Sequence, residues 1–251
     1  MKKLFLIAAM LLLLVIPVNA QALDIGVICY HSITDNPLKF SQYCISNDEF
    51  EEDVKYFSEN GYTFLKASEM WDADPNAKNI VLTSDDGYDN FYECVFPILK
   101  KYNAKAVVFL IGSRIDKDGY LKSWQIKEMD ESGLVEIGNH TNIMHRRQNN
   151  VLNSYFNDET LLEEYVNDIK DCSAKVYEIL GHGTESFSYP YGLYTDRLER
   201  VIRVNLGYNT TFTTKPGIVN SQEDILYPMR RIYRVHGDHP WEIEAKINEY
   251  K

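Results

Sequence analysis

Short β-rich runs alternate with longer segments of helical period along this chain, and this alternation restricts its possible folds more than any other feature. Ile25–Tyr30 and Ala106–Ile111 are apolar runs of strand length, whereas Glu159–Leu180 repeats its apolar residues with a helical period. Strands separated by helices pair in parallel, because each connection must cross back over the sheet. The pattern therefore predicts an α/β fold in which helices cover a parallel sheet.

The same periodicities place the other elements. A capping box at Ser46 and Glu49 marks the start of the first helix, and Pro97 is expected to disturb a later one. The expected strands are residues 25–30, 62–65, 79–83, 106–111, 134–137, 186–189 and 208–213. The expected helices are residues 46–61, 90–102, 123–132, 159–180 and 195–205.

The first twenty residues have the pattern of a secretory signal peptide. Two lysines precede an apolar run from Leu4 to Pro17, and Val18-Asn19-Ala20 forms a small-residue cleavage site. The run is shorter than the about 20 residues of a spanning helix, which favours cleavage over a retained anchor. We expect residues 1–20 to be a signal peptide and 21–251 to be one domain, secreted, periplasmic or at the cell surface, without a membrane span after cleavage.

Composition limits the partners. A formal net charge of −11 argues against nucleic acid, which selects basic surfaces. The 18 tyrosines suit stacking on sugar rings as well as ordinary packing. The four cysteines, which form no C-x-x-C pair that would indicate a thiolate metal cluster, are Cys29, Cys44, Cys94 and Cys172. Export would permit disulfides, but the sequence fixes neither their pairing nor the oligomeric state.

Two adjacent aspartates follow one of the expected strands directly. Thr83-Ser84-Asp85-Asp86-Gly87 comes after Ile80-Val81-Leu82, and His140 and His145 follow another strand. Because the carboxyl ends of parallel strands share one face, these side chains can converge there. Neighbouring strand residues point to opposite faces, so both carboxylates can face one pocket only if the backbone bends, which Gly87 permits.

Two carboxylates and two imidazoles can hold one divalent ion and leave one carboxylate as a base. This is the equipment for metal-assisted hydrolysis. The alternative interpretation is an ordinary Asp-Asp-Gly turn. His31, at the end of the first expected strand, is a candidate for the rim of the site, whereas His182 and His239 are expected to be solvated or structural.

In combination, these motifs resemble the polysaccharide deacetylase family, also called the NodB-homology or carbohydrate esterase family four group. The resemblance runs from about residue 25 to 235 and includes Thr-Ser-Asp-Asp-Gly in place of the family's Thr-Phe-Asp-Asp-Gly. The other matching segments are Tyr30-His31, Trp124-Gln125, Gly133, Gly138-Asn139-His140-Thr141 and Phe187-Ser188-Tyr189-Pro190-Tyr191-Gly192. The last has the Phe-x-Tyr-Pro-Tyr-Gly form of the branch that includes poly-N-acetylglucosamine deacetylases.

The resemblance implies a fold and an activity. The fold is a distorted (β/α) barrel with fewer than eight regular strands and helices outside. The activity is removal of acetyl groups from N-acetylglucosamine units of a carbohydrate polymer or oligosaccharide. It depends on one divalent metal ion, which we expect to be Zn²⁺.

The resemblance also assigns roles. Asp86, His140 and His145 correspond to the metal ligands, and Asp85 to the general base that deprotonates the attacking water. The backbone N–H of Tyr191 corresponds to a donor that stabilises the oxyanion, a task for preorganised dipoles. An acid must then protonate the leaving amine nitrogen.

Three departures from the family pattern concern individual site residues. His145 comes five residues after His140, whereas the family's second histidine usually comes four residues after the first. Ser188 stands where the family carries an arginine that orients the base, so Arg231 is the expected substitute. The Leu-x-His motif of the general acid is blurred, and His236 is the nearest candidate by position.

Two other functions stay open on the sequence alone. The chain could be an O-acetyl esterase of the same family, whose leaving group needs no proton from an acid. It could also be a catalytically silent glycan-binding protein on the same scaffold. Retention of Asp85, which a binding protein does not need, argues against the second alternative.

Overall fold

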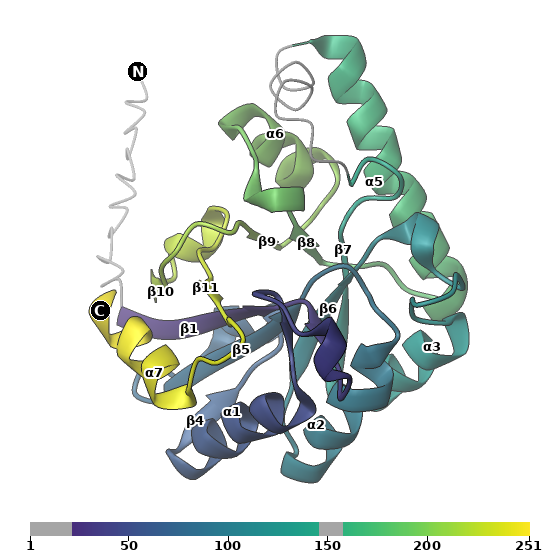
Figure 1. Cartoon of the computed structure of the whole chain (residues 1–251). Coiled ribbons are helices and arrows are strands. Elements are labelled where there is room, and N and C mark those ends of the chain that lie inside the picture. Colours follow the sequence, from purple (N-terminus) through teal and green to yellow (C-terminus); the bar gives the residue numbers. More distant parts are fainter. Residues whose placement is uncertain (1–21, 146–157) are drawn as a thin grey trace, which may run out of the picture.

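The computed structural model describes residues 22–145 and 158–251, in which a curled sheet lies inside a layer of helices (Figure 1). The predicted signal peptide falls outside these residues. Nine strands form the main sheet in the order β10-β1-β5-β6-β7-β8-β9, while β11 also pairs with β1 and β4 with β5. Their bounds are Ala22–Tyr30 (β1), Tyr62–Phe64 (β4), Lys78–Ser84 (β5), Ala106–Leu110 (β6), Val135–Asn139 (β7), Ser186–Ser188 (β8), Thr210–Phe212 (β9), Val219–Ser221 (β10) and Ile232–Tyr233 (β11).

The pairing is parallel throughout the main sheet except for β10, which runs antiparallel to β1. Two short strands, β2 (Ser32–Ile33) and β3 (Cys44–Ile45), pair separately. The expected strands are thus present, with ends shifted by a few residues. The structure adds β10, β11 and the helix at the carboxyl end, and the two strands are too short for side-chain alternation to reveal them.

Helices cover the outer face of the sheet. They are α1 (Asn47–Glu59), α2 (Phe96–Tyr102), α3 (Ser123–Glu131), α5 (Glu159–Leu180), α6 (Asp196–Arg200) and α7 (Pro240–Glu249). The predicted capping box at Ser46 is present, and Pro97 lies in the first turn of α2 after a π-helical turn at Phe91–Val95. Proline lacks the N–H that a continuous helix needs there. Among the described helices, none has the length and apolarity to cross a membrane.

Both faces of the sheet are buried, as in a barrel. Ile28, Leu82 and Val108 point outward and pack against Phe50 of α1 and other helix residues. The neighbouring strand positions point inward and fill the interior, among them Val27, Val81, Val107, Phe109 and Phe212. Alternation along each strand therefore supplies two apolar layers, which explains why the strands are almost uniformly apolar.

The sheet curls back toward closure through the segment that precedes β11. The Met229 N–H donates to the Thr211 carbonyl at 2.7 Å, and the Thr213 N–H donates to the Met229 carbonyl at 3.0 Å. This segment leads directly into β11, which pairs with β1 on the opposite side of the curl. The expected distorted (β/α) barrel is confirmed, as a curled, mostly parallel half-barrel with one short, irregular side.

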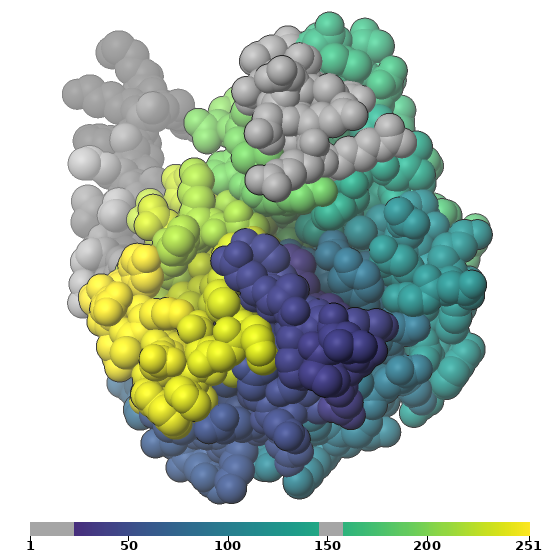
Figure 2. Space-filling view, in the orientation of Figure 1, coloured from purple at the N-terminus to yellow at the C-terminus, as the bar shows by residue number. Residues whose placement is uncertain are grey.

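A buried ion pair fastens the end of the chain to its beginning. Arg234 Nε donates to Asp53 Oδ2 at 2.6 Å, and the Tyr30 hydroxyl donates to the same oxygen at 3.1 Å. Arg234 and Asp53 have almost no exposed surface. Figure 2 shows the early segments, in purple, packed against the last ones, in yellow, on this side of the molecule. The pair therefore holds the segment after β11 on α1.

We predict that Asp53→Ala lowers the free energy of unfolding by about 3–5 kcal/mol, because it removes the buried carboxylate that accepts from Arg234 Nε and leaves the guanidinium only the more distant Glu49, 3.7 Å from Nη1. Urea denaturation followed by circular dichroism measures the loss. Glu52→Ala is the matched control, since Glu52 is exposed on the same helix. Equal stability of the two variants would show that the pair contributes no more than a surface carboxylate.

Candidate metal centre and active site

The carboxyl ends of the parallel strands border a cleft with a volume of about 1060 Å³. Side chains that follow different strands meet there, as a parallel α/β sheet requires. His31 follows β1, Asp85 and Asp86 follow β5, His140 follows β7 and Tyr191 follows β8, and all of them line the cleft. His145 lines it too, from the loop after β7.

Asp86, His140 and His145 form a compact cluster in this cleft. Their potential ligand atoms lie within 4.8 Å of one another. Asp86 Oδ1 is 3.7 Å from His140 Nε2 and 3.4 Å from His145 Nε2. One carboxylate and two imidazoles, with room for further ligands in the cleft, match the donor set of a catalytic zinc site. The three residues thus fit one divalent ion.

The protonation of these residues supports that fit. His140 Nδ1 lies 2.7 Å from the Ser188 carbonyl oxygen, which can only accept, so Nδ1 carries the proton and Nε2 is left for a ligand bond. Burial lowers the pKa of His140 to about 3 and also lowers that of His145. Both are therefore neutral near pH 7, the form that binds metals. Burial raises the pKa of Asp86 to about 6, a shift that a bound cation would reverse.

Three residues in the left-handed backbone region shape the loops of the cleft. Asp86 has φ 76°, Thr141 has φ 68° and Tyr191 has φ 56°. The Asp85 N–H still pairs with the Tyr30 carbonyl at 3.0 Å, so the chain leaves the strand only at Asp86. The expected bend therefore starts one residue before Gly87. It lets both adjacent carboxylates reach one cleft, at a backbone cost that a well-packed site must offset.

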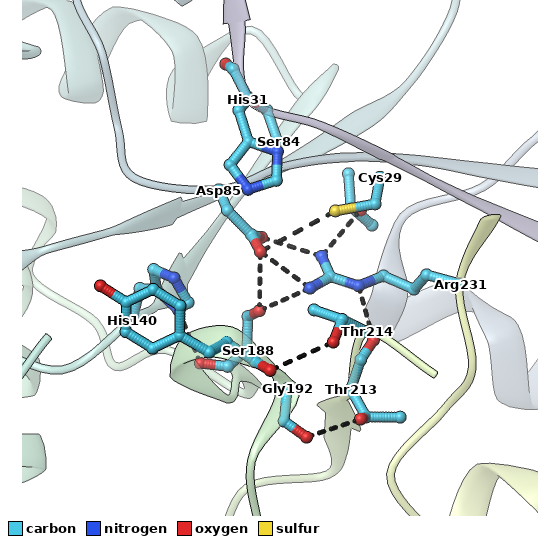
Figure 3. Close-up of polar contacts among 12 residues, drawn as sticks. Cys29, His31, Ser84, Asp85, His140, Ser188, Gly192, Thr213, Thr214 and Arg231 are labelled. Carbon is cyan, nitrogen blue, oxygen red and sulfur yellow. Dashed lines mark hydrogen bonds and ion pairs between the residues drawn. The ribbon is translucent and has the colours of Figure 1, made fainter. Parts of the chain in front are cut away.

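Asp85 accepts a bidentate ion pair from Arg231 (Figure 3). Arg231 Nη1 donates to Asp85 Oδ1 and Nη2 to Oδ2, both at 2.8 Å. The Ser188 hydroxyl donates to Asp85 Oδ2 at 3.2 Å and accepts from Arg231 Nη2 at 3.0 Å. The expected contact between Arg231 and Asp85 is thus present, with Ser188 bridging the two.

The ion pair fixes the charge of Asp85. Burial alone would raise the pKa of this carboxyl, but the Arg231 guanidinium outweighs burial and holds the pKa well below its usual range. Arg231 has no exposed surface, and its other hydrogen bonds go to Thr83 and Thr213. Asp85 is therefore ionised near neutral pH, and it is oriented by donors from two residues, Arg231 and Ser188.

Comparison with known proteins identifies the family. The family model for polysaccharide deacetylases matches residues 72–211, more than half of the chain. The chain belongs to the polysaccharide deacetylase family. It is therefore a hydrolase of the deacetylase type, acting on carbon–nitrogen bonds other than peptide bonds.

Relatives within the polysaccharide deacetylase family agree. YxkH of Bacillus subtilis (strain 168), assigned as a polysaccharide deacetylase, is 31% identical over 213 residues, covering 82% of this chain and 70% of YxkH. The poly-β-1,6-N-acetyl-D-glucosamine N-deacetylase of Escherichia coli (strain K12) is 28% identical, covering 78% of this chain, which spans only 34% of that protein. The solved structure of IcaB from Ammonifex degensii has 28% identity and a TM-score of 0.76, covering 89% of this chain and 96% of IcaB.

The structure separates His236, the expected acid, from His31, the expected rim residue. His236 is not among the residues that line the cleft: its ring lies 2.8 Å from a Glu49 carboxylate oxygen and packs on Phe40. His31 lines the cleft and lies close to the Asp85 carboxylate, with potential ligand atoms within 4.8 Å. In the sequence, the indication for His31 was that it follows a strand, and this predicted a position at the rim of the site.

Cys29, His31 and Asp85 form a second cluster of potential ligand atoms. Burial raises the pKa of the Cys29 thiol far above its usual range, and Asp85 is already paired with Arg231. This cluster therefore offers one imidazole as its only ready ligand and does not fit a metal ion. All four cysteines are free thiols.

Asp168 of α5 holds the loop that carries His145, a role the sequence analysis missed. Its carboxylate accepts hydrogen bonds from the backbone N–H groups of Asn142, Ile143 and Met144 at 2.7, 2.9 and 3.3 Å. Asp168 is only 4% exposed. The sequence did contain one indication of this role. Asp168 stands beside Ile169 in the apolar stripe of a long helix, where a carboxylate needs a buried hydrogen-bonding partner.

We predict that Asp168→Asn weakens zinc binding by about 10–100-fold, the usual effect of removing a group that positions a ligand. The amide keeps the size of the side chain but cannot accept all three N–H groups. Competition titration against a chromophoric chelator measures the affinity, and circular dichroism checks the fold. Asp171→Asn, at an exposed position of the same helix, is the control; equal affinities in the two variants would contradict the prediction.

Proposed function

We propose that this protein removes acetyl groups from N-acetylglucosamine units of an extracellular or cell-surface glycan and requires one divalent ion, zinc by our expectation. The observation that carries the proposal is the Asp86–His140–His145 cluster in the same cleft as the ionised Asp85. Relatives named as poly-β-1,6-N-acetyl-D-glucosamine N-deacetylases in Escherichia coli and Staphylococcus aureus support the substrate class. A signal peptide at residues 1–20 would export the activity.

The first half of the proposed reaction depends on Asp85. An ion held by Asp86, His140 and His145 would supply Lewis-acid polarisation of the acetyl carbonyl and acidify a water. Asp85 then accepts a proton from the attacking water. Its two hydrogen bonds from Arg231 keep it ionised and aimed before the reaction begins.

The oxyanion and the leaving nitrogen need their own donors. Tyr191 lines the cleft, and its ring lies 5.0 Å from that of His145, so its backbone N–H is proposed to stabilise the oxyanion. The turn packs closely on Thr214, since a Cβ at Gly192 would lie only 2.1 Å from Thr214 Oγ1. We assign the proton donor for the amine to His31, in place of His236, because His31 faces the reacting groups.

Acetate release tests the proposal as a whole. Purified protein is expected to release acetate from poly-N-acetylglucosamine, chitooligosaccharides or peptidoglycan fragments, and to stop after chelation and restart with Zn²⁺. Release from an O-acetylated xylan alone would instead favour the esterase. Binding of these glycans without acetate release in the metal-loaded protein would favour the silent binding protein.

We predict that Asp85→Asn keeps the bound metal but lowers kcat on the acetylated glycan by about 10²–10⁴-fold, the usual worth of a positioned proton acceptor. Asp86→Asn should instead deplete metal. Metal stoichiometry and acetate release are measured on both variants. Equal metal loss in the two variants would show that Asp85 is a ligand. Full activity in both would show that the Asp-Asp-Gly run is an ordinary turn.

We predict that His31→Asn slows hydrolysis of the acetamide by about 10²–10⁴-fold but that of p-nitrophenyl acetate far less. The amine must be protonated to leave, whereas p-nitrophenolate leaves without an acid. His236→Asn, the matched control outside the cleft, is expected to behave like wild type on both substrates. The opposite result, with only His236→Asn slow on the acetamide, would restore His236 as the acid.

A further inference from the structure

One wall of the cleft is a continuous row of side chains that leads away from the metal cluster. Tyr88 lies two residues after Asp86, and its ring stacks on that of Tyr120 with 5.2 Å between centroids. The guanidinium carbon of Arg114 lies 5.4 Å from the centroid of Tyr120. All three residues line the cleft. The two tyrosine rings therefore link Asp86, which Tyr88 contacts, to Arg114 along this wall.

The far end of this row is positively charged. Arg114 and Lys117 are the only described charged residues lining the cleft besides Asp85, Asp86 and the histidines. Both are exposed, and neither forms an ion pair with a carboxylate of the described residues. Asp116 interacts electrostatically with Lys117 but does not line the cleft. Two cleft-lining cations without an ion pair are notable in a chain with a net charge of −11. Charges in a cleft attract ligands of the opposite sign.

The charges near the reacting groups do not cancel these cations. Asp85 is neutralised by Arg231 in a buried ion pair, and a divalent ion would more than neutralise Asp86. Arg114 is also held by its stacking on Tyr120, so its planar donor face is partly preorganised for an oxyanion. Tyr43 and Tyr233, whose rings pack around His31, also line the cleft and add aromatic surface to it.

We propose that the cleft is specific for an acidic glycan, in which the sugar next to the N-acetylglucosamine unit carries a carboxylate or a phosphate bound by Arg114 and Lys117. The tyrosine pair would stack on the sugar between the two sites. This inference rests on the proposed deacetylase function and narrows its substrate. It assigns Arg114 and Lys117 as residues that determine specificity.

A matched set of oligosaccharides tests the proposal. The first has a carboxylate on every sugar that neighbours an N-acetylglucosamine unit, the second is the same compound with each carboxylate reduced to an alcohol, and the third carries a phosphate there. We expect kcat/KM for acetate release to be about tenfold higher for the preferred anionic oligosaccharide, carboxylate or phosphate, than for the alcohol form. A tenfold ratio corresponds to the free energy of one charge-assisted hydrogen bond. The preference should shrink as salt is added.

In Arg114→Gln/Lys117→Gln, the ratio of the anionic to the neutral kcat/KM is expected to fall to about one. Lys55→Gln/Lys127→Gln is the control with the same loss of charge, because these lysines make only exposed helix pairs at 4.0 and 3.9 Å; its ratio should equal that of wild type. Equal rates on the anionic and neutral oligosaccharides in wild type, or an unchanged ratio in the first double variant, would overturn the proposal.

Binding separates this inference from the proposed function. Calorimetry on Asp85→Asn, loaded with Zn²⁺, measures the affinity for the carboxylate and alcohol forms without turnover. Tighter binding of the carboxylate form supports an anion-binding subsite even if the wild-type protein releases no acetate. The absence of acetate release would then contradict the proposed function and not this inference. Release from the alcohol form with equal affinity for both overturns the subsite and leaves the deacetylase intact.

Discussion

The buried ion pair between Asp85 and Arg231 connects the chemistry of this protein to its architecture. A carboxylate without exposed surface would be protonated or displaced if it had no partner, because desolvation of a lone charge costs several kcal/mol. Arg231 prevents this with two hydrogen bonds to Asp85. It can do so only because β11 lies beside β1, which places the last strand against the first. The irregular closing side of the half-barrel is therefore part of the active site.

The loops around the cleft show how backbone strain is offset. Three left-handed residues without the freedom of glycine, Asp86, Thr141 and Tyr191, occur where the chain turns to present a site residue. Two of them are held by hydrogen bonds to their own backbone groups: the Thr141 N–H donates to Asn139 Oδ1 at 2.8 Å, and the Thr214 hydroxyl donates to the Tyr191 carbonyl at 3.2 Å. Such positions are found mainly where a site must be rigid before substrate binds.

Much of the fold could be predicted from the sequence because β1, β5 and β6 are apolar runs of strand length and α5 repeats its apolar residues with a helical period over 22 residues. The convergence of Asp85, Asp86 and His140 followed from their places after parallel strands. The place of Asp168 in an apolar stripe indicated a buried partner, but not which one, because the three backbone N–H groups that it binds leave no mark in the sequence. His31 was underestimated for a related reason: which strand-end histidine faces the cleft depends on the curl of the sheet, which local pattern does not encode.

The ion pair also orders the assembly of the molecule in time. Arg231 follows Asp85 by 146 residues, so a nascent chain makes most of its sheet before the cation exists. Contacts this distant in sequence form late, since the loop between them must first be ordered. A chain interrupted before Arg231 would leave the Asp85 carboxylate in the interior without its cation. The segment that closes the half-barrel therefore also completes the electrostatics of Asp85.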